Sequence, residues 1–248
     1  MATSRNPLTG LPQIDWRTMM STQVLSTLTF APAQRIQTSF LAPLESQTLR
    51  WLAERTPRCV NSDHLTLLGL AAMFFAGAGY WWSSHNHYAL VLVIACLALN
   101  WLGDSLDGTL ARVRNQQRPR YGFYVDHIVD AFSTFFLMGG LALSGYMAER
   151  VAIGIMIVYL VISIEVYLAT YTRGTFQISF MRFSPTELRI LLAIGNIALF
   201  FHPTVHIFGQ GYRLFDVGGS IGILGMTIIL LRSTLANTLA LYRSETLR

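Results

Sequence analysis

The chain has 248 residues, of which 52% are hydrophobic and 12% are charged, and its net charge is +5 at pH 7. So few charges, together with a positive mean hydropathy, indicate a membrane protein and argue against a soluble globular domain. The basic residues, all arginine, lie at the ends of apolar segments and form no stripe with interleaved aromatics, which argues against a nucleic-acid-binding protein.

The N-terminal part is predicted to precede the membrane domain. Residues 1–34 are polar and interrupted by prolines, so we expect a tail without a signal peptide. Residues 35–63 are predicted to be an amphipathic juxtamembrane helix and linker, because apolar and charged residues alternate around Trp51. Such a helix suits the membrane interface, although an ordinary surface helix packed on the bundle is the alternative.

Residues 64–248 are predicted to form the membrane domain. Apolar segments cover about residues 65–82, 88–106, 124–146, 151–171, 187–201 and 217–242. Most approach the ~20 residues that span a bilayer, and the fifth is marginal. The predicted fold class is an all-α integral membrane protein with six transmembrane helices and an N-terminal amphipathic interfacial helix. Glycines at helix-packing spacing in the third and sixth segments predict close helix approach in the bundle or a dimer: Gly139, Gly140, Gly218, Gly222 and Gly225.

The loops predict the orientation, because arginine-rich and arginine-poor loops alternate along the chain. By the positive-inside rule, both termini and the arginine-rich loop 112–120 should be cytoplasmic. We expect the cell inner membrane, since no organelle-targeting segment is evident.

Four aspartates stand out in the polar stretch that flanks this loop: Asp104, Asp107, Asp126 and Asp130. On helices, the first two share one face and the last two share another. Ionised carboxylates repel one another in a shared pocket, and a divalent cation removes that conflict. Hard oxygen ligands favour Mg²⁺, Mn²⁺ or Ca²⁺ over zinc. The stretch therefore predicts a metal-dependent site that acts on a phosphorylated substrate.

The same stretch reads Asp-x2-Asp-Gly-x2-Ala-Arg-x9-Gly-x3-Asp-x3-Asp, and this pattern resembles the signature of the CDP-alcohol phosphatidyltransferases. Every position is filled: Asp104, Asp107, Gly108, Ala111, Arg112, Gly122, Asp126 and Asp130. The resemblance covers most of residues 51–190. It implies phospholipid synthesis by transfer from a CDP-linked donor to an acceptor hydroxyl with release of CMP, two Mg²⁺ or Mn²⁺ ions, and a homodimer.

The resemblance also implies roles for these residues. Asp104, Asp107 and Asp126 resemble the main metal ligands, and Asp130 resembles a residue beside the ions that serves as general base. The remaining positions resemble the nucleotide and donor site, where the glycines let the nucleotide approach the backbone and the arginine contacts the donor phosphate: Gly108, Ala111, Arg112 and Gly122.

A second resemblance lies upstream, where residues 61–69 look like the family's Pro-Asn-x-x-Thr entry to the first helix. Thr66 matches the threonine, and Asp63 stands where asparagine is usual, which implies nucleotide contacts for both. Asp63 is equally compatible with an N-cap of a helix that starts at His64.

The acceptor side is predicted from residues 165–189. Glu165 interrupts an apolar run, which suggests a functional role or a buried hydrogen-bonding one. Residues 170–174 and 184–187 look like segments of choline and ethanolamine phosphotransferases, which join CDP-aminoalcohols to diacylglycerol. Arg173 departs from that pattern and suits either a phosphate-bearing acceptor or a purely topological role. Arg118 and Arg120 are further candidates for acceptor binding, and the sequence leaves open which substrate carries the lipid.

Two rival functions predict different features. An ion-coupled transporter predicts internal repeats and broken helices near the midplane, and no repeat is found in the sequence. A non-catalytic relative that binds CDP-lipids has no need of a base at Asp130, so its Asp130→Asn variant would be harmless.

Overall fold

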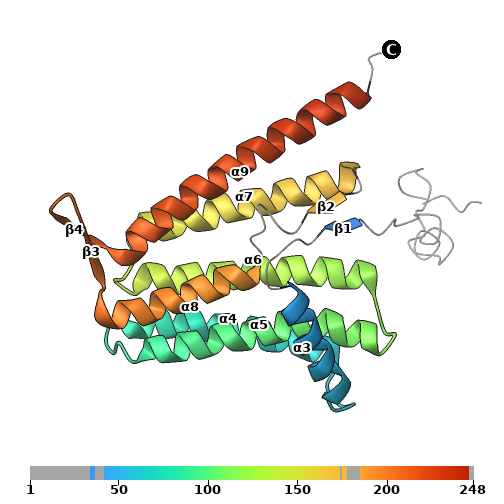
Figure 1. Ribbon diagram of the computed structural model, residues 1–248, viewed down its shortest axis with the longest axis horizontal. Coiled ribbons are helices and arrows are strands. Elements are labelled where there is room, and N and C mark those ends of the chain that lie inside the picture. Colours follow the sequence, from blue (N-terminus) through green and yellow to red (C-terminus); the bar gives the residue numbers. More distant parts are fainter. Residues whose placement is uncertain (1–33, 37–41, 174, 178–184, 246–248) are drawn as a thin grey trace, which may run out of the picture. The chain divides into compact units, whose positions relative to one another are not determined.

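The computed structural model describes residues 34–36, 42–173, 175–177 and 185–245, all within one unit, Ala33–Arg248. Helices dominate this part of the chain (Figure 1). The elements are β1 (Gln34–Ile36), α3 (Ala42–Arg55), α4 (Ser62–Ser83), α5 (Ala89–Val113), α6 (Pro119–Leu143), α7 (Glu149–Arg173), β2 (Thr175–Gln177), α8 (Pro185–Phe201), β3 (Thr204–Ile207), β4 (Gln210–Arg213) and α9 (Leu214–Ser244).

Among the described residues, five helices are long and apolar enough to cross a membrane: α4, α5, α6, α7 and α9. The chain is therefore a mostly helical protein with several candidate membrane spans, as the hydropathy predicts. The predicted fifth segment corresponds to α8, which has 17 residues and is the shortest of the helices that match the six predicted segments. A sixth span through α8 stays a prediction.

The predicted membrane segments are all helices, but their ends differ from the prediction. The second segment was predicted to end near residue 106, and α5 continues to Val113; the third was predicted to begin near residue 124, and α6 begins at Pro119. Proline suits the first turn of α6, because a backbone N–H at that position would have no hydrogen-bond partner within the helix. All four motif aspartates consequently lie within helices.

Short strands add to the predicted all-α architecture. β1 and β2 pair in parallel, and β3 and β4 form an antiparallel hairpin between α8 and α9. The hairpin turns through Phe208 and Gly209, both at positive φ, of which only glycine adopts that conformation without strain. The predicted polar tail, residues 1–34, lies outside the described residues except for Gln34.

Helix α3 occupies residues 42–55 of the predicted juxtamembrane stretch. It packs against α5, and its Leu49 and Ala53 are buried in a cluster with Leu65, Leu106 and Leu110. Trp51 on its other side is exposed. A membrane-interfacial role for this exposed side stays a prediction.

The Glu45 carboxylate of α3 is hydrogen-bonded to two other helices. Glu45 Oε1 accepts hydrogen bonds from Trp101 Nε1 at 2.9 Å and Ser105 Oγ at 3.2 Å, both on α5, and from Thr186 Oγ1 at 2.9 Å, on α8. The three donors compensate the cost of removing this carboxylate from water.

Helix α4 packs against both α5 and α6, and these are the two most extensive helix–helix contacts in the described part of the chain. Glycines permit the close approach on each side. A Cβ atom on Gly103 of α5 would lie 2.5 Å from the Leu65 carbonyl oxygen, and one on Gly140 of α6 would lie 2.0 Å from the Gly77 carbonyl oxygen. Only glycine at these two positions lets the backbones come this close.

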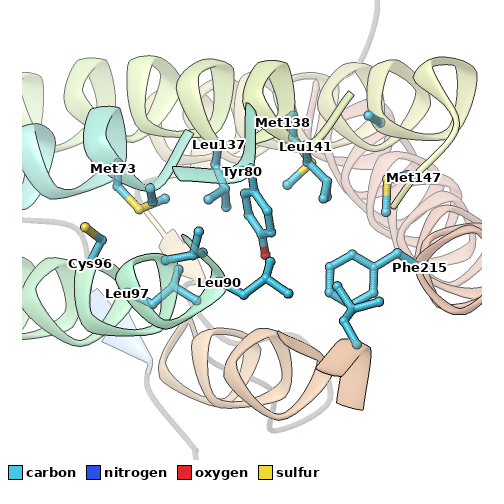
Figure 2. Packing of buried hydrophobic residues seen from close by; sticks show 14 of the residues in the cluster. Met73, Tyr80, Leu90, Cys96, Leu97, Leu137, Met138, Leu141, Met147 and Phe215 are labelled. Atoms are coloured by element: carbon cyan, nitrogen blue, oxygen red, sulfur yellow. The ribbon is translucent and has the colours of Figure 1, made fainter. Parts of the chain in front are cut away.

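The larger hydrophobic core surrounds the other end of α4 (Figure 2). Tyr80 is fully buried there among Leu90, Leu137 and Leu141. Its hydroxyl accepts a hydrogen bond of 2.8 Å from Asn196 Nδ2, which satisfies the phenol and ties α8 to α4.

The glycine predictions are correct in part. Gly140 mediates close helix approach, whereas a Cβ on Gly139 would meet no atom within 4 Å. The same holds for Gly218, Gly222 and Gly225, so the expected contact of these three within the bundle is wrong. Their neighbour Gly219 makes it instead, since its Cβ would lie 2.6 Å from Val151 Cγ1. A dimer contact through the open glycines stays a prediction.

Gly140→Ala should destabilise the protein because the added methyl group collides with the backbone of α4. We expect a loss of about 2 kcal/mol or more and a clearly lower unfolding temperature in detergent. Gly139→Ala is the matched control, since its methyl group enters open space. Equal unfolding temperatures for the two variants would refute the close α4–α6 contact.

Candidate active site

The four motif aspartates come from two helices that flank one loop. Asp104 and Asp107 lie near the C-terminal end of α5, and Asp126 and Asp130 lie in the first half of α6. Asp107 interacts electrostatically with Asp104 and Asp126, and Asp130 interacts with the other three. The structure thus brings together the four carboxylates that the sequence singled out.

Asp107 is held by the start of α4. It is only 7% exposed, and its Oδ2 accepts a hydrogen bond of 2.6 Å from Thr66 Oγ1. Its Oδ1 accepts from the backbone N–H of Gly108, and Ser62 Oγ donates to its backbone carbonyl at 2.9 Å. Thr66 is therefore at the aspartate cluster, where the upstream pattern predicted a site residue.

Asp63, in contrast, faces the loop between α5 and α6. Its carboxylate accepts a hydrogen bond from Arg118, which raises the pKa of that guanidinium. The N-cap of α4 is Asn61, so the alternative that Asp63 caps this helix is wrong. Arg118 also stacks over the Tyr121 ring at 4.2 Å.

Arg189 on α8 completes the cluster, and the sequence analysis missed it. Its Nη2 donates to Asp104 Oδ2 at 2.7 Å, and it also interacts electrostatically with Asp130. The Arg189 side chain is 14% exposed. An arginine inside an apolar segment is costly unless it is paired, and this was the signal available in the sequence.

The donor set fits a divalent cation by its chemistry. Asp130 and the three carboxylates within its electrostatic range supply hard oxygen ligands, and their repulsion favours binding of positive charge. Within the described residues, no three histidine, cysteine, aspartate or glutamate side chains are arranged as ligands of one ion.

The family model for CDP-alcohol phosphatidyltransferase matches residues 61–239, from the N-cap of α4 into α9. The chain belongs to the CDP-alcohol phosphatidyltransferase family. Comparison with curated proteins finds no significant match. The family implies a membrane transferase of phosphate-containing groups in phospholipid synthesis, using CDP-alcohol donors and alcohol acceptors and generally depending on divalent metals.

The remaining signature positions lie beside the carboxylates. A Cβ on Gly108 would lie 3.6 Å from Arg112 Nη1, so the exposed Arg112 guanidinium covers this glycine. Arg112 Nη2 also donates to Thr109 Oγ1 at 2.9 Å. A Cβ on Gly122 would meet nothing within 4 Å, and Ala111 is half-buried. Packing within the chain does not require glycine at position 122, so its open backbone is accessible to a ligand.

The tentative acceptor residues Glu165 and Arg173 lie at the contact between α7 and α9. Glu165 Oε1 accepts from Asn237 Nδ2 at 2.6 Å and from Ser233 Oγ at 3.0 Å, and Arg173 donates to Asn237 Oδ1. These hydrogen bonds support the alternative in which Glu165 has a hydrogen-bonding role inside the bundle. Acceptor binding by Glu165 and Arg173 stays a prediction. Arg120, also a tentative acceptor residue, lies in the first turn of α6.

Arg189→Gln tests the charge balance of the cluster. Because Asp104 is partly exposed and its pair is screened by solvent, we expect a destabilisation of about 1–2 kcal/mol without divalent metal. Excess Mg²⁺ should reduce this loss by supplying positive charge, which thermal unfolding in detergent with EDTA or Mg²⁺ would reveal. Arg50→Gln is the control, since Arg50 makes only an exposed pair with Glu54. An identical loss in EDTA and Mg²⁺ would contradict this account.

Proposed function

We propose that this protein transfers a phosphate-linked alcohol from a CDP-linked donor to an acceptor hydroxyl and releases CMP. The observation that carries the proposal is the electrostatically linked set of four aspartates within a complete family signature. A non-catalytic CDP-lipid binder would not need a fourth carboxylate, and a transporter would not need the nucleotide signature.

The donor would bind where the signature leaves backbone open. Gly122 would allow close approach of the nucleotide, and Gly108 lies under the exposed Arg112 guanidinium, which would bind the donor diphosphate. Thr66 contributes by holding Asp107. Ala111 and Asp63 complete the proposed donor site, in which the charged Asp63–Arg118 pair borders the loop.

Asp104, Asp107, Asp126 and Asp130 would hold Mg²⁺ or Mn²⁺, with two ions expected. When bound, the ions neutralise charge that develops on the phosphoryl oxygens during transfer. Arg189 offsets part of the carboxylate charge and orients Asp104 through their 2.7 Å hydrogen bond.

Asp130 is the proposed general base. The acceptor oxygen forms a bond to the phosphorus that bears the alcohol, and the bond from that phosphorus to the bridging oxygen breaks. CMP leaves with the electron pair, and the acceptor proton passes to the Asp130 carboxylate. A base must lie within hydrogen-bond reach of the proton that it takes. Asp130 interacts with the other three aspartates and with Arg189, and this central position supports the assignment.

The substrate pair is left as two alternatives, CDP-diacylglycerol with a small alcohol, or a CDP-aminoalcohol with diacylglycerol. Arg118, Arg120, Arg173 and Glu165 remain proposed acceptor contacts. We also propose a homodimer in the cell inner membrane, with both termini and the aspartate cluster on the cytoplasmic side, on the basis of the loop charges and the family.

Acceptor-dependent CMP release by the purified protein tests the function. With Mg²⁺ or Mn²⁺, CDP-diacylglycerol would be offered with polyols, serine and sugar phosphates, and CDP-choline or CDP-ethanolamine with diacylglycerol. Asp130→Asn should lower kcat about 100-fold or more because it removes the proton acceptor, while donor binding is largely retained. Glu149→Gln, an exposed change at the start of α7, is the control. Donor binding without release from any pair would favour the non-catalytic binder.

Metal removal gives a separate prediction. EDTA should abolish CMP release, and Mg²⁺ or Mn²⁺ should restore it, since the oxygen ligand set suits hard cations. Zn²⁺ at the same free concentration should restore less. Full turnover in EDTA would refute a divalent-metal mechanism while leaving the family membership intact.

A further inference from the structure

Helix α7 carries a polar face that the family signature does not include. Tyr159, Ser163 and Tyr167 are spaced at i, i+4 and i+8, so they share one face of an otherwise apolar helix. This face contacts α6, because Tyr167 packs against the His127 ring at a centroid distance of 4.5 Å. Glu165 lies on a different face and contacts α9.

Both phenols of this face lie near Asp130. Tyr159 interacts electrostatically with Asp130 and is hydrogen-bonded to the side chain of Thr134. Thr134 Oγ1 in turn donates to the backbone carbonyl of Asp130 at 2.9 Å. Tyr167 interacts electrostatically with Asp130 and is hydrogen-bonded to Ser163. Both phenols therefore lie within electrostatic range of the proposed base, against the face of α6 that carries His127, Asp130 and Thr134.

The polar face of α7 lies on a different helix from the residues of the proposed donor site. The donor residues lie at the start of α4, on α5 and in the first turn of α6, whereas the phenols approach Asp130 from α7. The general base must lie next to the acceptor hydroxyl, because that is the proton it removes. Groups that surround the base on the side away from the donor are therefore placed to hold the acceptor.

The chemistry of the face matches a neutral hydroxyl. A phenol can both donate and accept a hydrogen bond and adds no charge beside four carboxylates. The rings of Tyr167, His127 and Phe123 form an aromatic surface, with Phe123 and His127 4.1 Å apart between centroids. Such a surface suits an uncharged alcohol group better than a phosphate, which would require cationic partners.

We propose that Tyr159 and Tyr167 are substrate-positioning residues that hold the acceptor alcohol against Asp130. The inference rests on the proposed function and extends it by assigning the acceptor side to α7. The two phenols orient the reacting hydroxyl, and Thr134 fixes the position of Tyr159. Loss of either phenol oxygen should weaken acceptor binding while the donor site keeps its contacts.

The test is a kinetic comparison of Tyr159→Phe and Tyr167→Phe with wild type, using the substrate pair that supports CMP release. We expect the acceptor KM to rise about 3–10-fold in each variant, as the loss of one hydrogen bond predicts, with the donor KM changed less than about 2-fold. Tyr242→Phe on α9 is the control, since Tyr242 is 76% exposed and lies outside the proposed site. Thr134→Val should reproduce part of the Tyr159→Phe effect.

The outcomes separate this inference from the function on which it rests. Absence of turnover in wild type overturns the proposed function and the inference together. Turnover in which the acceptor KM values of Tyr159→Phe and Tyr167→Phe equal that of Tyr242→Phe overturns the inference alone. So does an equal rise in the donor and acceptor KM, or a lower unfolding temperature with both KM values unchanged, since either result indicates a structural role.

Discussion

Electrostatic repulsion among four carboxylates in an apolar helical protein is the constraint on which this structure depends. Asp104, Asp107, Asp126 and Asp130 are close enough to interact, and each needs a compensating partner. Thr66 donates to one, and Arg189 pairs with another. The partners come from α4 and α8, so helices outside the signature stabilise the charges that the signature requires. Repulsion among the carboxylates also favours binding of a divalent cation.

Helix packing then decides how the carboxylates are arranged. Helix α4 packs against both α5 and α6, which carry the two pairs of aspartates. The close contacts at Gly103 and Gly140 fix α4 against each neighbour, so they set the separation of the pairs. Small residues at these helix contacts therefore influence the geometry of the aspartate cluster, as is common where helix association depends on packing.

Much of this arrangement could be predicted because hydropathy and motif spacing report local properties. The apolar segments, the aspartates and Thr66 follow from periodicity and from a signature within one stretch of sequence. Arg189 was missed because its partner Asp104 is 85 residues away, and no local pattern links the two. The end of α5 was predicted too early and the start of α6 too late, because polar residues within 107–113 and 119–123 lower the hydropathy without ending the helix. Gly219 was missed among its neighbours because facing partners, not spacing, decide which glycine is packed.

The Glu45 carboxylate has a mechanical consequence. One oxygen of α3 holds donors from α5 and from α8, and two of these donors, Ser105 and Thr186, lie one and three residues from Asp104 and Arg189. A displacement of α3 along its axis would strain all three hydrogen bonds together, because they share a single acceptor atom. Helix α3, which lies outside the candidate membrane spans, is thus coupled through Glu45 to the segments of α5 and α8 that carry the salt bridge between Arg189 and Asp104.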